Sequence, residues 1–325
     1  MLPSFSYVRP GTLGDAVKQA ASEGAGVLAG GTDLLGCMRD GILPLTKLVS
    51  MSGVKDLRGI GKRPDGGLSI GSLTTITEVA ESAVVRGNYP ALSMAASEVA
   101  SPQLRNQGTI GGNLCQKPRC WYYRGDFHCL RKGGDRCFAA GGENPYHCIF
   151  GGGPCFIVHA SDIAPALVAF GASVRTSGPK GERTVPVGKF HVLPSVDVRR
   201  DTVLEAGEIV TAIELPPAPK GARSLYRKVR ARNSWDFALA GAAIVVTMND
   251  KTVTSARIVL SGAAPIPWRS KETEDAVTGK RLDDKVIAKA ADAVVLNAMP
   301  LAQNGYKLHL FRGIIREELK KLAGA

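Results

Sequence analysis

The distribution of apolar and polar positions predicts short helices alternating with short buried strands. Residues 12–23 carry apolar side chains at helical spacing, with Thr12 as a possible N-cap and Gly24 after the last turn. Apolar runs at residues 26–29 and 47–51 each predict a buried strand. The first 55 residues are therefore expected to form one small unit of helix and strand.

A second unit is predicted from about residue 67. Thr75 and Glu78 have the spacing of a capping box, which predicts the start of a helix, and residues 91–100 predict an amphipathic helix. The strands expected in this unit are residues 68–70, 173–176 and 208–214.

The proline-rich segment 215–220 is the best candidate for an interdomain linker. Beyond it, residues 238–248 and 252–260 predict a hairpin, and helices are expected at about 270–278, 283–298 and 307–323. The expected domains are a first subdomain at 1–55, a second subdomain at 56–216 and a C-terminal domain at 220–325.

Composition and charge narrow the possible functions. With 44% hydrophobic and 22% charged residues the chain is an ordinary globular protein, and no apolar run is long enough to span a membrane. The formal net charge of +12 is spread along the chain without basic runs, which argues against nucleic acid and favours an anionic ligand or an acidic partner subunit. The N-terminus does not resemble a secretory signal, so we expect a cytoplasmic protein, or a periplasmic one if a partner carries the export signal.

The cysteines are concentrated in one segment. Six of the seven lie within residues 115–155, a glycine-rich stretch with little periodicity that reads as a long insertion. Such clustering in a large chain points to a metal or cluster site rather than to a disulfide framework. Because no C-x-x-C pair occurs, spacing alone leaves three alternatives open: an iron–sulfur cluster, a zinc site or reduced structural thiols. Cys37 stands apart and is expected to be a core thiol.

Two glycine-rich loops are candidates for binding phosphate. One is Ala29-Gly-Gly-Thr-Asp33 and the other is Gly108-Thr-Ile-Gly-Gly-Asn113. Glycines let the backbone approach a ligand closely, and their free N–H groups suit phosphate oxygens. Neither loop has the G-x-G-x-x-G spacing or the lysine of a P-loop. From these residues alone they are either the two walls of one dinucleotide site or two unrelated turns.

Five further short motifs occur along the chain. They are S-P-Q-L-R-N-Q-G at 101–108, His159-Ala-Ser-Asp162, G-E-I-V at 207–210, Y-R-K-V-R at 226–230 and A-P-I-P-W-R at 264–269. With the two glycine loops, they make the chain resemble the FAD-binding medium subunit of the molybdenum hydroxylases, the xanthine dehydrogenase and carbon monoxide dehydrogenase family. The resemblance implies an α+β fold, with a two-lobed FAD-binding domain of the molybdenum hydroxylase/vanillyl-alcohol oxidase type and a C-terminal domain of sheet and helices.

The resemblance also implies an FAD site. Its pyrophosphate would be wrapped by Ala29, Gly30, Gly31, Thr32, Asp33 and Leu34, and the second wall would be formed by Thr109, Gly111, Gly112 and Asn113. Asp162 would bind the adenosine side, and Lys228 would lie near the flavin ring. The simpler alternatives are that Asp162 is a helix N-cap and that Lys228 is a solvated strand lysine. The family places an aromatic residue near the flavin around positions 190–193, but the resemblance does not indicate which side chain of this segment contacts the ring here.

Two branches of this family carry a comparable insertion, the β subunit of 4-hydroxybenzoyl-CoA reductase and the FAD subunit of a periplasmic aldehyde oxidoreductase. In both, four cysteines hold an extra 4Fe–4S cluster. The resemblance implies that the thiolate ligands here are Cys120, Cys129, Cys137 and Cys155, with Cys148 as the rival of Cys155. The cationic side chains expected to offset the cluster's negative charge are Arg119, Arg131, Lys132 and Arg136.

The implied role is electron transfer within a larger enzyme. FAD and the 4Fe–4S cluster would pass electrons between the 2Fe–2S clusters of a small subunit and an external carrier (ferredoxin, NAD or quinone), while the molybdenum cofactor lies on a large subunit. The substrate of the complex would be an aldehyde or an aromatic acyl-CoA, and no catalytic acid, base or nucleophile is expected on this chain. The alternatives are a stand-alone FAD oxidoreductase and a zinc-stabilised interaction subunit without flavin.

Overall fold

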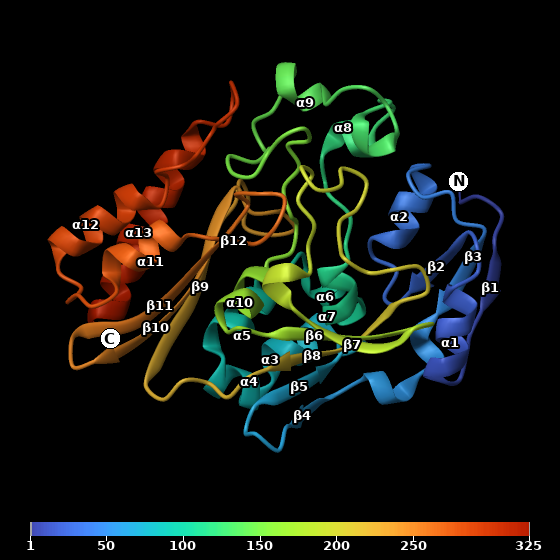
Figure 1. Cartoon of the computed structure of the whole chain (residues 1–325), viewed down its shortest axis with the longest axis horizontal. Helices are drawn as coiled ribbons and strands as arrows, with labels where there is room; N and C mark the ends of the chain where they lie inside the picture. Colours follow the sequence, from blue (N-terminus) through green and yellow to red (C-terminus); the bar gives the residue numbers. More distant parts are fainter. Residues whose placement is uncertain (1, 325) are drawn as a thin grey trace.

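The computed structural model describes residues 2–324, which form three sheets with helices packed against them (Figure 1). The N-terminal lobe has a parallel three-stranded sheet in the order β1 (Ser6–Val8), β3 (Lys47–Ser50) and β2 (Ala25–Leu28). Helix α1 (Leu13–Ala20) covers it, with the Thr12 hydroxyl accepting the Asp15 N–H as predicted. Helix α2 (Leu34–Arg39) starts directly after the first glycine loop.

The second lobe is built on an antiparallel five-stranded sheet. In spatial order its strands are β4 (Ile60–Lys62), β5 (Leu68–Gly71), β8 (Ile209–Leu215), β6 (Ser173–Gly178) and β7 (Gly181–Pro186). Its helices are α3 (Ile76–Glu81), α4 (Ala83–Asn88), α5 (Pro90–Ser97), α6 (Pro102–Gln107), α7 (Ile110–Leu114) and α10 (Ile163–Ala169). The predicted capping box opens α3: the Thr75 N–H donates to Glu78 Oε2 and the Glu78 N–H donates to Thr75 Oγ1.

The C-terminal part has an antiparallel four-stranded sheet covered on one side by helices (Figure 1). The strands in spatial order are β12 (Trp268–Arg269), β11 (Thr252–Ser261), β10 (Ala240–Asn249) and β9 (Ala222–Val229). The helices are α11 (Lys271–Val277), α12 (Asp284–Ala293) and α13 (Tyr306–Gly324). The hairpin and the three helices were predicted from the sequence, and the structure confirms them.

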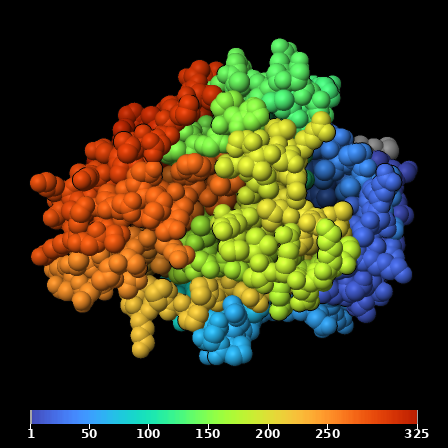
Figure 2. Space-filling model, in the orientation of Figure 1, coloured from blue at the N-terminus to red at the C-terminus, as the bar shows by residue number. Residues whose placement is uncertain are grey.

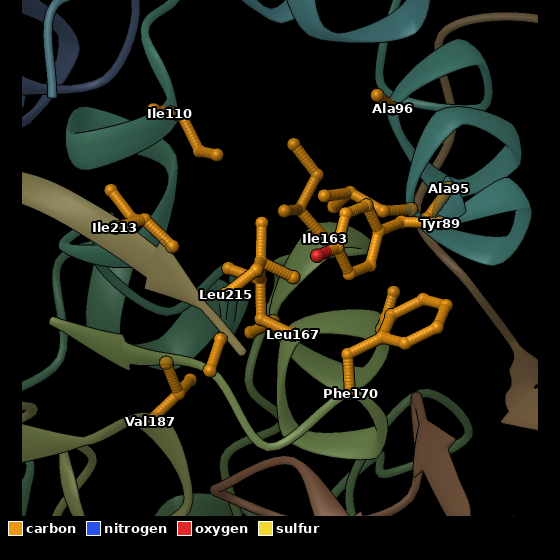
Figure 3. Close-up of a cluster of buried hydrophobic side chains, with 14 of the residues drawn as sticks. Tyr89, Ala95, Ala96, Ile110, Ile163, Leu167, Phe170, Val187, Ile213 and Leu215 are labelled. Atoms are coloured by element: carbon orange, nitrogen blue, oxygen red, sulfur yellow. The ribbon is translucent and has the colours of Figure 1, made fainter. Parts of the chain in front are cut away.

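The largest hydrophobic core joins the second lobe to the C-terminal sheet. Figure 3 shows its part in the second lobe. Tyr89 and Phe170 meet edge to face, with ring centroids 5.1 Å apart. Buried residues of β10 and β11 belong to the same cluster as Leu167 of α10, so the second and third sheets share one core. The Tyr89 hydroxyl donates to the Pro216 carbonyl at 2.7 Å, which holds the predicted linker against this core.

The cysteine-rich insertion contains only short helices and lies along the upper side of the molecule in Figures 1 and 2, beside the segment around residue 200. The helical turns are α8 (Trp121–Arg124), η3 (Leu130–Lys132) and α9 (Phe138–Gly141). Asn144 exchanges two hydrogen bonds with Gln303, and the Tyr306 hydroxyl donates to the Pro145 carbonyl. The insertion is therefore fixed to the start of α13, although its own backbone has little regular structure.

Several predicted elements have different bounds. The helix expected at 91–100 is α5 and ends at Ser97, because Ala100 has a left-handed backbone (φ 45°) and Pro102 begins the next helix. The helix expected at 283–298 is α12 and ends at Ala293. Strand β9 was not predicted from the sequence. Its burial does not alternate regularly, so it lacks the two-residue period that marks a half-buried strand.

Candidate cofactor site

The two glycine loops lie against each other, although about 80 residues separate them. A Cβ atom at Gly30 would overlap the carbonyl oxygen of Gln107, at the start of the second loop. A Cβ atom at Gly112 would lie 3.9 Å from the Cβ of Ala29. Glycine is required at Gly30 because the two backbones approach more closely than a side chain allows. The structure thus brings both predicted walls together.

A cavity of about 430 Å³ opens beside these loops. Five of the predicted ligand-binding residues line it: Thr32, Asp33, Gly112, Asn113 and Asp162. A neighbouring cavity of about 190 Å³ is lined by three more, Ala29, Thr109 and Gly111. The predicted residues that line neither cavity are Gly30, Gly31, Leu34 and Lys228.

Lys228 reaches the cavity through Asp162. Its ammonium lies 2.8 Å from Asp162 Oδ2 and donates to the Glu98 carbonyl, and its side chain is fully buried. The alternative that Lys228 is a solvated strand lysine is therefore wrong. Tyr226 donates its hydroxyl to Asp162 Oδ1 at 2.7 Å. Burial raises the pKa of Asp162, while Lys228 and Tyr226 counteract the rise.

Asp162 does not cap a helix through its side chain. It precedes α10, but its carboxylate makes no capping hydrogen bond, and the Ser161 hydroxyl accepts the Ala164 N–H instead. Asp162 therefore occupies the N-cap position of α10, as the alternative proposed, but its carboxylate does not cap the helix. With two donors on its oxygens and a place on the cavity wall, Asp162 offers a buried acceptor to a ligand.

The side chain of Asp33 is bound to the insertion. Its carboxylate accepts the Lys117 N–H and the guanidinium of Arg124, both at 2.7 Å, and lies 2.7 Å from Arg119. Burial lowers the pKa of Arg119, which Asp33 opposes. These bonds leave the backbone of Asp33, rather than its carboxylate, for the ligand contact predicted from the sequence.

Sequence reasoning missed the loop between β9 and β10. Arg232, Trp235, Asp236 and Phe237 line the large cavity, and Trp235 and Phe237 are exposed. The signal that could have found them is a Trp-Asp-Phe run in a short connection, where exposed aromatic side chains are unusual. Phe237 also lies under the guanidinium of Arg119, 5.0 Å from its ring centroid.

Segment 190–193 does not reach the large cavity. Phe190 is fully buried in the core. The ring nitrogen Nε2 of His191 donates a hydrogen bond to the Leu114 carbonyl at 3.0 Å. The rings of His191 and His159 lie with centroids 4.0 Å apart, and burial lowers the pKa of both, that of His191 to about 4. None of the side chains of this segment lines the cavity, so it supplies no aromatic wall in this structure.

The four cysteines expected to hold a cluster line one enclosed space. Cys120, Cys129, Cys137 and Cys155 surround a cavity of about 10 Å³. Cys148, the rival of Cys155, is buried but does not line this cavity. Among residues 2–324, no group of three or more His, Cys, Asp or Glu side chains is spaced to hold a metal ion. The four thiols thus line one small enclosed space, but they are not arranged as a metal-binding group in this structure.

The thiols of this cavity interact with one another. A hydrogen bond with Cys155 lowers the pKa of Cys137 to about 6, whereas that bond and burial raise the pKa of Cys155. Burial raises the pKa of Cys120 to about 11. His147 Nε2 lies 3.3 Å from the Cys120 sulfur, and burial lowers the pKa of His147 to about 4. Cys37 is fully buried, as predicted for a core thiol.

The geometry of the site agrees with comparisons to known proteins. Residues 3–218 match the family model described as the FAD binding domain in molybdopterin dehydrogenase, and residues 224–322 match the CO dehydrogenase flavoprotein C-terminal domain. The chain is 36% identical to the aldehyde oxidoreductase FAD-binding subunit PaoB of Escherichia coli K12, over 95% of each chain. It is 29% identical to the carbon monoxide dehydrogenase medium chain of Hydrogenophaga pseudoflava, over 92% of this chain and 88% of that one.

Solved structures give the same result. Carbon monoxide dehydrogenase from Hydrogenophaga pseudoflava aligns with a TM-score of 0.77 and 26% identity, over 98% of this chain and 96% of that chain. Reconstituted carbon monoxide dehydrogenase from Oligotropha carboxidovorans aligns with a TM-score of 0.79 and 25% identity, over 100% and 99%. The chain belongs to the family of FAD-binding medium subunits of the molybdenum hydroxylases. It is an oxidoreductase subunit, and the predicted fold class is confirmed.

No helix within residues 2–324 is both long and apolar enough to cross a membrane.

Proposed function

We propose that this chain is the FAD- and 4Fe–4S-containing electron-transfer subunit of an aldehyde-oxidising molybdenum hydroxylase. The observation that carries the proposal is the proximity of two sites. Arg119 lines the 430 Å³ cavity, and the next residue, Cys120, lines the four-cysteine cavity. Electron transfer requires cofactors to be close, and adjacent residues of one chain segment line these two cavities.

The larger cavity suits FAD. Its volume falls within the usual range for small-molecule sites, roughly 300–1,000 Å³. The glycine loops would bind the pyrophosphate through backbone N–H groups, since Gly30 lets the two loops pack together and Gly112 lines the cavity without a side chain. Asp162, held by Lys228 and Tyr226, would accept hydrogen bonds from the adenosine side. Bound FAD supplies exchange of one or two electrons, and this chain's residues supply binding and orientation.

The four-cysteine cavity suits an iron–sulfur cluster in its donor set. Four thiolates are the usual ligands of a 4Fe–4S cluster, and the other polar side chains that line this space are Tyr122, Tyr123 and Arg131. The cavity of about 10 Å³ is smaller than a cluster, so the cysteine side chains would have to move apart as ligands bind. The short, irregular backbone between these cysteines can allow that movement.

The substrate class follows from the relatives. Aldehyde oxidation is the activity named for the 36% identical subunit, so we infer an aldehyde as the substrate of the complex. The partners would be a large molybdenum-cofactor subunit and a small 2Fe–2S subunit, with ferredoxin, NAD or a quinone as the external carrier. The complex would lie in the cytoplasm unless a partner carries an export signal.

The test is a measurement of iron, acid-labile sulfide and flavin on the anaerobically purified full chain. We expect about four irons and four sulfides with one FAD per chain. Cys137→Ser should lose iron and keep FAD. Cys148→Ser is the control and should keep both, because Cys148 is a thiol of the same insertion that does not line the cavity.

Other outcomes contradict parts of the proposal. Flavin without iron would remove the cluster and leave the family membership intact. Zinc without flavin would favour the interaction subunit that the cysteine spacing left open. Aldehyde oxidation by the isolated chain, without partner subunits, would favour the stand-alone oxidoreductase.

A further inference from the structure

Arg131 is the one cationic side chain among the residues that line the four-cysteine cavity. It lies in η3, two residues after Cys129, and its side chain is 2% exposed. A buried guanidinium cannot lose its proton, so a full positive charge lies against this space. Charge in such a position strongly affects any anionic group nearby.

Only one of the three nitrogen atoms of this guanidinium has a hydrogen-bond partner. Nη2 forms an ion pair with Asp201, whereas Nε and Nη1 are buried and donate to no atom within the described residues. Leaving a buried donor without an acceptor costs about 1–3 kcal/mol for each group. Two such donors beside a cavity lined with thiols indicate that an acceptor absent from the polypeptide belongs there.

The orientation of Arg131 is fixed from two sides. Asp201 binds it and is itself held by the Lys117 ammonium at 2.7 Å. The ring of Tyr123 lies under the guanidinium, 5.6 Å from its carbon to the ring centroid. The free Nε–H and Nη1–H therefore cannot turn toward solvent without breaking the bond with Asp201.

We propose that Arg131 donates Nε–H and Nη1–H to the sulfur atoms of the iron–sulfur cluster and thereby raises its reduction potential. This inference rests on the cluster proposed above. Reduction adds negative charge to the cluster, and a cation with N–H donors stabilises the reduced form more than the oxidised one. Asp201 acts as a positioning residue, since it holds the guanidinium without lining the cavity.

The neighbouring cations do not share this role. Arg136 is exposed and lies over the ring of Phe138, and Lys132 donates to the Gly125 carbonyl. Neither lines the cavity, and water screens an exposed charge. Arg136 is therefore the matched control: the same side chain, in the same insertion, with its charge in solvent.

The experiment measures the cluster's reduction potential by a dye-mediated dithionite titration followed by EPR, on the full chain after iron and sulfide analysis. Arg131→Met should keep its iron and bind an electron at least tenfold more weakly, a negative shift of about 59 mV. Arg131→Lys should shift less, because the charge remains and the paired donors are lost. Arg136→Met should match the wild type.

An iron-loaded R131M with the wild-type potential would overturn the inference and leave the cluster proposal standing. Absence of iron from the wild type would overturn the cluster proposal itself. If R131M folds by circular dichroism but holds no iron, R131K decides: a negative shift supports the role of the donors, and an unchanged potential overturns it.

Discussion

Asp162 and Lys228 form an ion pair at 2.8 Å in which both side chains are almost fully buried, 5% and 0% exposed. Lys228→Met leaves a buried carboxylate with one hydroxyl donor, and we expect it to lower the free energy of unfolding by about 3–5 kcal/mol. Urea denaturation followed by circular dichroism measures this. The double variant D162N/K228M should recover much of the loss, because Tyr226 can still donate to the amide oxygen. A double variant as unstable as K228M would contradict this account.

Gly30→Ala should abolish FAD binding while the chain stays folded, because the added Cβ would overlap the Gln107 carbonyl and force the two loops apart. Flavin content per chain, with circular dichroism for folding, is the measurement. Gly36→Ala is the control. It lies in α2 with no atom within 4 Å of the added Cβ, so FAD should stay bound and the helix should gain up to about 1 kcal/mol. Full flavin content in G30A would show that the loops do not jointly hold the cofactor.

The burial of Lys307 should make the free energy of unfolding depend on pH, and the direction of its pKa shift gives the sign. Burial lowers its pKa from 10.5 to about 8, and its ammonium donates to the carbonyls of Gly262 and Tyr146. Between about pH 8 and 10.5 the unfolded chain keeps this proton while the folded chain has lost it, so this group makes stability rise with pH.

The test compares the wild type with Lys307→Met. The difference in unfolding free energy, wild type minus K307M, should increase by up to about 1.4 kcal/mol per pH unit across that window. Subtracting the variant removes the contributions of the buried thiols, which titrate in the same range with the opposite sign. A difference that is constant from pH 7 to 10 would show that Lys307 keeps its ordinary pKa in the folded chain.

Asp33→Asn should loosen the insertion, because the amide replaces a carboxylate that binds Arg119, Arg124 and the Lys117 N–H. We expect thermolysin to cleave within residues 115–155 several times faster than in the wild type. Asp40→Asn is the control, because it removes a carboxylate paired with Arg39 at the surface. Thermolysin should cleave this variant at the wild-type rate, since exposed ion pairs contribute about 0–1 kcal/mol to stability. Equal rates in both variants would mean that other contacts hold the insertion.

Thr75→Ala should cost about 1 kcal/mol, the usual effect of removing an N-cap hydroxyl. Thr75 also pairs with Thr109, at the start of the second glycine loop. Weaker FAD binding is therefore expected together with the loss of stability, and isothermal titration of the apo chain with FAD measures it. Thr77→Ala, two residues further along in α3 and half-buried, is the control and should leave FAD affinity unchanged.

Local sequence signals predicted the elements that depend on local chemistry. The Thr12 cap, the capping box at Thr75 and the hairpin around Asn249-Asp250 all formed as expected. Strand β9 could not be predicted in this way, since its pattern is set by long-range contacts with β10 and α5.

The candidate site was predictable only in part, for a similar reason. The sequence indicated that Asp33 and Lys228 matter but not that each is held by residues more than 60 positions away. Nor could it indicate that Arg131 is buried against the cysteines while Arg136 is in solvent, because both occur in the same run of polar residues. Burial of a long charged side chain depends on what the rest of the chain places over it.

The contacts of the insertion have a consequence for the order of folding. Its bonds reach 84 residues back to Asp33 and 159–161 residues forward to Gln303, Tyr306 and Lys307. Such distant pairings form late, after the loop-closing entropy has been overcome. Residues 303–307 therefore close over the cysteine segment late in folding, and we expect its thiols to stay accessible until the rest of the fold has formed.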